Sequence, residues 1–247
     1  MKRWHFLLGL VFLVTLLGGL IAFTPLSFVM RHSGAVQQGL AWQQARGTVW
    51  QGQVTGLSWR GTPLGAVNLE SHPLRLVSGG PSHEVTWSGP LGQGQARIAL
   101  RRTALKADGI SLSVPLTGQI GTDPLFAGLG ATVRLSNGSV RMTGTECETA
   151  SGTVTSDVAR LAAAGFGRDW PILTGPLTCE NGQLHAVLTG EAADGTQIRL
   201  VADSLAGARA EVRGMDEDIE SVLLAAGFRD AGGALVYNRG IGPREME

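Results

Sequence analysis

The N-terminal apolar run from Trp4 to Phe23 constrains this chain more than any other feature of its sequence. The run holds a single ionisable residue, His5, and a single hydroxyl side chain, Thr15. About 20 apolar residues at a rise of 1.5 Å match the hydrocarbon core of a bilayer, which is about 30 Å thick. The run therefore predicts a transmembrane helix over residues 6–23, followed by a much longer and more polar body.

Basic residues at the start of the chain set the predicted orientation of this helix. Lys2 and Arg3 precede the run, and the cytoplasmic flanks of membrane helices are enriched in Lys and Arg. We therefore expect residues 1–5 to be a cytoplasmic tip and residues 6–23 to be an uncleaved signal-anchor. The rest of the chain would then lie outside the cytoplasm.

A cleaved signal peptide is the alternative interpretation of the same run. Cleavage requires small residues at positions −3 and −1. The nearest candidate, Leu20-Ile21-Ala22, fails at −3, and Pro25 follows closely. Both interpretations place the body of the chain outside the cytoplasm.

The composition of the body indicates many short strands and tight turns. Glycine makes up 36 of the 247 residues, about twice its usual share of about 7%, and it follows no collagen period. The formal net charge is zero and no basic stripe is present, so no nucleic-acid partner is expected.

Short segments with alternating apolar and polar residues predict an antiparallel sheet that faces water on one side. Residues 24–44 are interpreted as a linker or a short helix. Two strands, 45–50 and 53–59, are then predicted to join near Gln51-Gly52. Further strands are predicted at residues 64–69, 74–77, 84–87 and 95–100.

Four dipeptides predict hairpin turns because Asn-Gly and Asp-Gly readily supply the positive φ angles of a type I′ turn. They are Asp108-Gly109, Asn137-Gly138, Asn181-Gly182 and Asp194-Gly195.

Two helices are predicted from their capping residues. Ser156 is expected to cap a helix that runs to Ala164, with Gly165 after its end. Residues 216–226 form the second, with three acidic residues at the start and Gly227 after the end. The helix ends at 161–166 and 223–228 match closely, which indicates either a weak internal duplication or a chance likeness of Ala-rich helix ends.

The two cysteines, Cys147 and Cys179, are predicted to form a disulfide, because such a pair outside the cytoplasm rarely serves another purpose. Two free buried thiols are the alternative. No CxxC pair exists, so thiol redox catalysis is not expected.

No catalytic, metal-binding or cofactor-binding motif is recognisable. The segment from Gly56 to Arg60 departs from a nucleophile elbow at its last position. The five histidines lack ligand spacing, and no glycine-rich loop ends in Lys-Ser or Lys-Thr. The chain is therefore predicted not to be an enzyme, and no cofactor is expected.

The tryptophans offer either a bulky core for a glycine-rich sheet or an apolar partner surface. Trp42, Trp59 and Trp87 are the candidate partner or groove aromatics. The positions of Trp42, Trp50 and Trp59 predict rings on neighbouring strands that stack across the sheet.

The segment Gly47-Thr48-Val49-Trp50-Gln51-Gly52 carries a family resemblance. Together with an N-terminal anchor and a β-rich body, it resembles protein N of the bacterial type II secretion system (general secretion pathway protein N). Pro63 to Val67, Pro73 to Leu76 and the cysteine-containing segment 147–179 are similar to later parts of that family. The likeness spans residues 6–238. Asn68-Leu69-Glu70 departs from it, where family members often carry a Trp.

The resemblance implies a non-catalytic accessory component of the secretion machinery. Its implied partners are the inner-membrane platform proteins and the outer-membrane secretin, with the bilayer contacted through residues 6–23. The predicted fold is mainly β, with curved antiparallel sheets and two or three short helices. The periplasmic domain is expected over residues 45–238, with halves at 45–150 and 151–238, and 239–247 as a disordered tail.

A second function class fits the same sequence. A curved sheet with an apolar concave face could hold lipid, as in the AsmA-like periplasmic proteins, which also carry one N-terminal anchor and a long run of strands. Their grooves are usually longer than about 200 residues can build, so this interpretation ranks second. A secreted hydrolase released by signal cleavage ranks third.

Overall fold

Antiparallel strands with alternating side chains build most of the part of this chain that the structure describes. The computed structural model describes residues 9–10, 12–13, 15–16, 19, 23–71, 82–101, 104–116, 128–202 and 207–240. The chain divides into two units, Met1–Pro90 and Leu91–Glu247. Every strand pair within the described residues of each unit is antiparallel. The prediction of a mainly β, antiparallel fold with short helices is confirmed.

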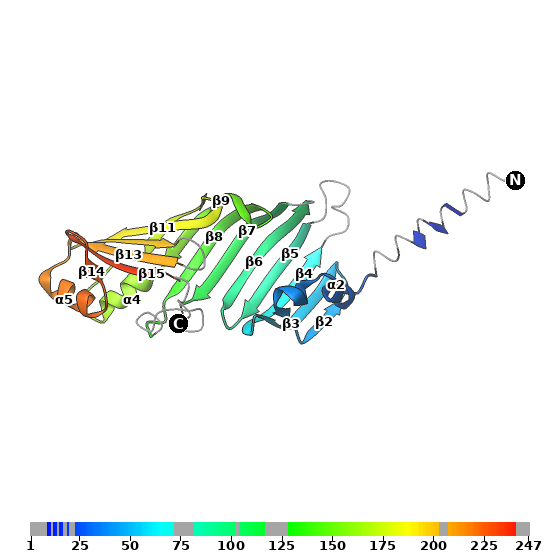
Figure 1. Cartoon of the computed structure of the whole chain (residues 1–247), viewed down its shortest axis with the longest axis horizontal. Coiled ribbons are helices and arrows are strands. Elements are labelled where there is room, and N and C mark those ends of the chain that lie inside the picture. The colour runs from blue at the N-terminus through cyan, green and yellow to red at the C-terminus, as the bar shows by residue number, and fades with distance from the viewer. Residues whose placement is uncertain are drawn as a thin grey trace, which may run out of the picture. The chain divides into compact units, whose positions relative to one another are not determined.

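The first unit places two short helical segments before its strands (Figure 1). Strand β3 pairs with β4 on one side and with both β1 and β2 on the other, and β4 pairs with β5. The elements are α2 (Leu26–His32), the 3-10 helix η1 (Ala35–Gln38), β1 (Leu40–Ala41), β2 (Gln44–Gly47), β3 (Gln51–Trp59), β4 (Thr62–Ser71) and β5 (Ser82–Gly89).

The turn between β2 and β3 lies earlier than the sequence predicts. A junction at Gln51-Gly52 is wrong, because β2 ends at Gly47 and β3 begins at Gln51. Gly47 has a φ of 83°, and the hydroxyl oxygen of Thr48 accepts hydrogen bonds from the backbone N–H groups of Trp50 and Gln51, at 3.3 and 3.2 Å. These hydrogen bonds from the threonine side chain close the turn at residues 48–50, before the predicted junction.

The other segments predicted for the first unit are confirmed in part. The linker or short helix predicted at 24–44 contains α2, η1 and β1. The strands predicted at 64–69 and 84–87 are confirmed as parts of β4 and β5. The strand predicted at 74–77 lies outside the described residues.

The second unit is a meander of longer strands interrupted by two helices. Neighbouring strands pair in chain order from β6 to β13, β13 then pairs with β15, and β15 with β14. The strands are β6 (Gly92–Arg101), β7 (Ala104–Pro115), β8 (Thr132–Thr143), β9 (Glu146–Ser156), β10 (Leu173–Glu180), β11 (Gln183–Glu191), β12 (Gln197–Ala202), β13 (Gly207–Arg213), β14 (Arg229–Asp230) and β15 (Ala234–Gly240). The helices are α4 (Val158–Ala164) and α5 (Glu217–Ala225).

Both helices lie at one end of the second unit and cover one face of its sheet (Figure 1). Apolar side chains alternate with polar ones along the strands, so each strand sends an apolar set to this face. The buried core is Val154, Ala159, Ala163, Trp170, Leu173, Ala186, Leu188, Ala192, Ile198, Val212, Ile219, Leu223, Phe228 and Leu235. Of the tryptophans considered as core, Trp170 fits that role most fully, at 4% exposed.

Two of the four predicted turns are confirmed as connections between strands. Asn181 and Gly182 join β10 to β11 with φ angles of 52° and 74°, as a type I′ hairpin requires. Asp194-Gly195 lies between β11 and β12, but only Gly195 has a positive φ. There the Asp194 side chain instead accepts the N–H of Thr196 at 2.9 Å and closes a longer loop.

The other two predicted turns are wrong. Asp108-Gly109 lies inside β7 and Asn137-Gly138 inside β8, each at a shift in strand register. A β-bulge absorbs the positive φ of Gly109 and Asn137 without reversing the chain. Pairing with neighbours on both sides carries each strand through the bulge.

The predicted helices both form, with one change of cap. Helix α5 begins after Asp216, whose side chain accepts the N–H of Ile219 at 3.0 Å, and Gly227 follows its end with a φ of 95°. Helix α4 begins after Asp157, one residue later than a cap at Ser156 predicts. The hydroxyl oxygen of Ser156 still accepts the N–H of Val158, the first helix residue, at 3.3 Å. Asp157 instead accepts the N–H of Thr132 at 2.6 Å and ties the helix start to β8.

No helix within the described residues is both long enough and apolar enough to cross a membrane. Most of the anchor predicted at residues 6–23, the tip at 1–5 and the tail from residue 241 lie outside the described residues.

Candidate functional site

Residues 47–52, which carry the family resemblance, contact the residues that follow the apolar run. We call residues 47–52 the motif turn. Pro25 forms a β-bridge with Thr48, and the N–H of Val49 donates to the carbonyl of Thr24 at 3.2 Å. Leu26 is buried next to the motif turn. The motif turn therefore holds residues 24–26 against the strands of the first unit.

Two glycines allow the backbone of the motif turn to lie very close to its neighbours. A Cβ atom on Gly52 would lie 2.6 Å from Cδ2 of Leu26 and 2.7 Å from the carbonyl oxygen of Thr48. A Cβ on Gly47 would lie 2.3 Å from the carbonyl oxygen of Gln51. All three distances are shorter than an ordinary contact, so a side chain at either position would force its neighbours to shift. Sequence reasoning singled out this motif but missed that its partner is the chain's own segment 24–26.

The candidate aromatics differ in burial and in their hydrogen-bond partners. Trp42 and Trp50 lie in connections rather than on strands, so the predicted stacking of rings from neighbouring strands is wrong. Trp87 is half-buried and donates through Nε1 to the carbonyl of Leu64 at 2.6 Å. Trp59 is the exposed one of the three candidates, at 47%.

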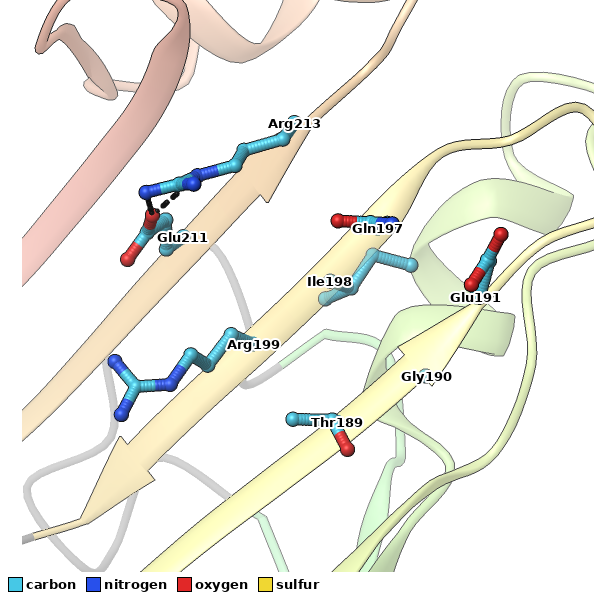
Figure 2. A pocket seen from close by; sticks show the side chains of 8 residues that line it. All are labelled: Thr189, Gly190, Glu191, Gln197, Ile198, Arg199, Glu211 and Arg213. Atoms are coloured by element: carbon cyan, nitrogen blue, oxygen red, sulfur yellow. Dashed lines mark hydrogen bonds and ion pairs between the residues drawn. The ribbon is translucent and has the colours of Figure 1, made fainter.

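Several charged side chains lie on β11, β12 and β13, on the side of the sheet away from the helices (Figure 2). We call this surface the charged face. It forms an open groove of about 480 Å³, lined by Thr189, Gly190, Glu191, Gln197, Ile198, Arg199, Glu211 and Arg213.

A buried carboxylate organises the charged face. Glu211 is buried and its Oε1 accepts from Nε of Arg213 at 2.6 Å. Arg199 lies directly opposite Glu211 on the neighbouring strand, and its guanidinium forms no ion pair with another described residue. An exposed guanidinium beside a neutralised carboxylate can donate paired hydrogen bonds to a carboxylate or carbonyl of a partner protein.

Sequence reasoning missed this face, although a signal for it exists. Arg209, Glu211 and Arg213 occupy alternate positions between small or apolar residues. Because side chains alternate between the two faces of a strand, all three of these residues lie on the same face.

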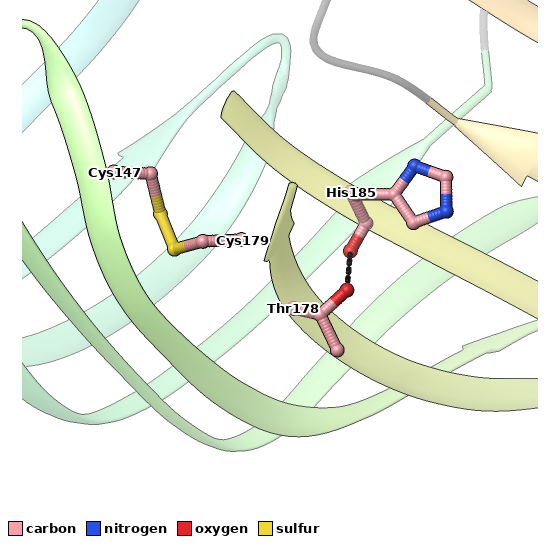
Figure 3. The surroundings of a disulfide bond; sticks show 4 residues. All are labelled: Cys147, Thr178, Cys179 and His185. Carbon is pink, nitrogen blue, oxygen red and sulfur yellow. Dashed lines mark hydrogen bonds between the residues drawn. A yellow bond between two sulfur atoms is a disulfide. The ribbon is translucent and has the colours of Figure 1, made fainter. Parts of the chain in front are cut away.

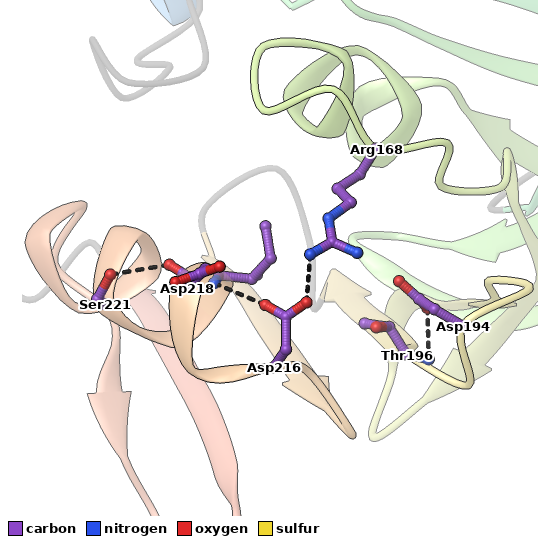
Figure 4. A network of polar contacts seen from close by, with 7 residues as sticks. Arg168, Asp194, Thr196, Asp216, Asp218 and Ser221 are labelled. Atoms are coloured by element: carbon purple, nitrogen blue, oxygen red, sulfur yellow. Dashed lines mark hydrogen bonds and ion pairs between the residues drawn. The ribbon is translucent and has the colours of Figure 1, made fainter.

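A polar network joins the ends of the two helices (Figure 4). Arg168, which follows α4, forms an ion pair with Oδ2 of Asp216 at the start of α5. The neighbouring Asp194 is fully exposed, and the hydrogen bond from the backbone N–H of Thr196 lowers its pKa. The contact between Arg168 and Asp216 ties the two helices together.

Replacement of Asp216 separates its two contacts. Asp216→Ala is expected to lower the free energy of unfolding by about 1 kcal/mol, because the cap of α5 is lost. Asp216→Asn keeps the capping oxygen and loses an exposed ion pair with Arg168, which contributes about 0–1 kcal/mol. Urea denaturation should show the larger loss for alanine, whereas equal losses would contradict the capping role.

The disulfide predicted between Cys147 and Cys179 is confirmed (Figure 3). It joins the start of β9 to the end of β10, with 5.7 Å between the Cα atoms. Within the described residues the β9–β10 ladder pairs 153–156 with 173–176, so the covalent bond closes the opposite end of the two strands.

Metal ligands do not gather in the part of the chain that the structure describes. It holds no group of three or more His, Cys, Asp or Glu side chains placed to bind a metal ion.

Comparison with known families gives one match over most of the chain. Residues 38–238 match the family described as type II secretion system (T2SS), protein N. The matched range includes the motif turn, both cysteines and the charged face. No curated protein and no solved structure matches the chain.

Proposed function

Because this chain belongs to the type II secretion system protein N family, we propose that it is an inner-membrane-anchored accessory component of that machinery. In this proposal residues 6–23 span the inner membrane and the remainder lies in the periplasm. The family is a secretion component and not a known enzyme family, which supports a non-catalytic role. The match over residues 38–238 is the observation that carries the proposal.

The proposed role is that of an interaction module between the inner-membrane platform and the outer-membrane secretin. The charged face supports this role, because Arg199 is exposed on a rigid strand and its neighbour Glu211 is already paired with Arg213. Charged groups in such an arrangement select a partner by electrostatic complementarity more than they add raw affinity.

Photocrosslinking in cells tests this role. A photoreactive amino acid in place of Arg199 is expected to capture a platform protein or the secretin. The same group in place of Ser221, which is exposed on α5, serves as the control and should capture neither. Failure of the Arg199 position to capture any secretion subunit, in cells that produce the whole machinery, would contradict the proposal.

A lipid-holding function, as in the AsmA-like proteins, is the second candidate. One observation favours it: the apolar face of β6, β7 and β8 is only half-buried and contributes few residues to the core under the helices. Its half-buried side chains include Ile98, Ile110, Leu112, Val140 and Met142. Phospholipid attached to a photoreactive group at Leu112, with no protein captured at Arg199, would reverse the ranking.

A further inference from the structure

The charges of this chain are divided unevenly along its length. The first acidic residue is Glu70, whereas five basic residues precede it: Lys2, Arg3, Arg31, Arg46 and Arg60. Lys2 and Arg3 belong to the tip assigned to the cytoplasmic side, so the residues beyond the run, up to residue 69, carry a net charge of +3 in a chain whose formal net charge is zero. A segment of this charge is attracted to anionic lipid headgroups.

Large apolar side chains are exposed in the same part of the chain. On α2, Leu26 points into the unit and is buried, while Phe28 is 56% exposed and Val29 is also exposed. Val36 on η1 is 60% exposed. Exposed apolar groups rimmed by polar residues mark surfaces that contact a protein or a membrane.

The contacts of residues 24–26 fix where this surface lies relative to the apolar run. The bridge from Pro25 to Thr48 and the hydrogen bond to Thr24 leave the chain little freedom between the run and α2. Phe28 lines the same open hollow as Leu16 and Phe23. Any bilayer that receives the run must therefore come close to Phe28.

Residues at the end of β3 extend the same surface with groups suited to a headgroup region. Trp59 donates through Nε1 to the carbonyl of Gln38 at 3.3 Å, which joins β3 to η1. The guanidinium of Arg60 lies 4.9 Å from the Trp59 ring centroid. Neither Arg31 nor Arg60 forms an ion pair with another residue that the structure describes. Tryptophan and arginine are typical of the boundary between lipid and water.

We propose that α2 and η1 dock on the surface of an anionic bilayer, with Phe28, Val29 and Val36 inserted at the headgroup boundary. Arg31 and Arg60 contact lipid phosphates in this arrangement. The proposal rests on the anchor assigned above to residues 6–23. A protein partner fits this surface less well, because the segment carries positive charge alone and directly follows the run.

Fluorescence quenching with the full chain in vesicles tests the docking. The native cysteines form a disulfide, so a single new cysteine can carry an environment-sensitive fluorophore. The labelled variants are Phe28→Cys, Val36→Cys, Leu13→Cys within the run, and Thr86→Cys, an exposed strand residue of the same unit. The vesicles contain phosphatidylethanolamine and phosphatidylglycerol, with a nitroxide high on a fraction of the acyl chains.

We expect quenching by roughly half at positions 28 and 36, because an interfacial helix sinks its apolar face about 5–10 Å into the boundary. Position 13 should be quenched and position 86 should not. Adding Arg31→Glu and Arg60→Glu should weaken the quenching at position 28 but leave that at position 13 unchanged.

The other outcomes distinguish the two proposals. Quenching at position 13 with none at 28 and 36 would overturn the docking and leave the anchor standing. No quenching at position 13 would overturn both. Equal quenching at positions 28 and 86 would also overturn the docking, as would capture of one protein by a photocrosslinker at position 28 in cells.

Discussion

Loss of the Cys147–Cys179 disulfide is expected to lower the melting temperature of the oxidised protein by roughly 10 °C. The bond closes a loop with a sequence separation of 32, for which chain entropy gives about 3–4 kcal/mol. Cys147→Ser and Cys179→Ser should produce the same loss. Thermal unfolding followed by circular dichroism measures it.

Reduction provides the internal control for this prediction. A thiol reductant should bring the wild-type melting temperature down to that of the serine variants and should leave the variants themselves unchanged. A wild-type protein that melts at the same temperature with and without reductant would show that the bond contributes nothing to stability.

Replacement of Gly52 by alanine is expected to cost about 1–3 kcal/mol, the usual range for overpacking. The new methyl group would lie 2.6 Å from Leu26 and 2.7 Å from a backbone carbonyl that cannot move freely. Residues 24–26 should therefore lose their contact with the motif turn. Limited trypsin digestion should show faster cleavage after Arg31, and thermal unfolding should show the lost stability.

Gly128→Ala is the matched control for this variant. A Cβ on Gly128 would meet nothing within 4 Å, so its stability should change by no more than about 0.5 kcal/mol. Cleavage after Arg31 at the same rate in both variants would contradict the seating of residues 24–26.

Local sequence signals predicted the class of fold well because they depend on neighbouring residues. Alternation along Glu84 to Trp87 needs only the period of a strand, and the structure places it in β5. The capping role of Asp216 is likewise local, since its partner Ile219 is three residues away. The disulfide followed from the compartment and from the number of cysteines.

Signals that depend on distant partners could not be interpreted from the sequence alone. Asn137-Gly138 and Asn181-Gly182 have the same composition, but only the second reverses the chain. The first lies against Ile110, on the neighbouring strand β7, and this pairing keeps β8 extended through the bulge. Nothing in the dipeptide itself predicts that pairing.

The candidate site was predictable only in part, for a similar reason. The resemblance marked Gly47 to Gly52, but what they hold depends on a contact with Pro25, more than twenty residues earlier. The ion pair of Glu211 with Arg213 was accessible from the alternation of β13, whereas the position of Arg199 opposite Glu211 depends on the strand register.

The short ladder between β9 and β10 has a consequence for how this part of the sheet opens. Four residue pairs join these strands at one end, and the sulfur–sulfur bond secures the other. Without that bond the two strands would be joined at one end alone. The end that holds Cys147 and Cys179 is therefore where the sheet is expected to open first once the sulfurs are reduced.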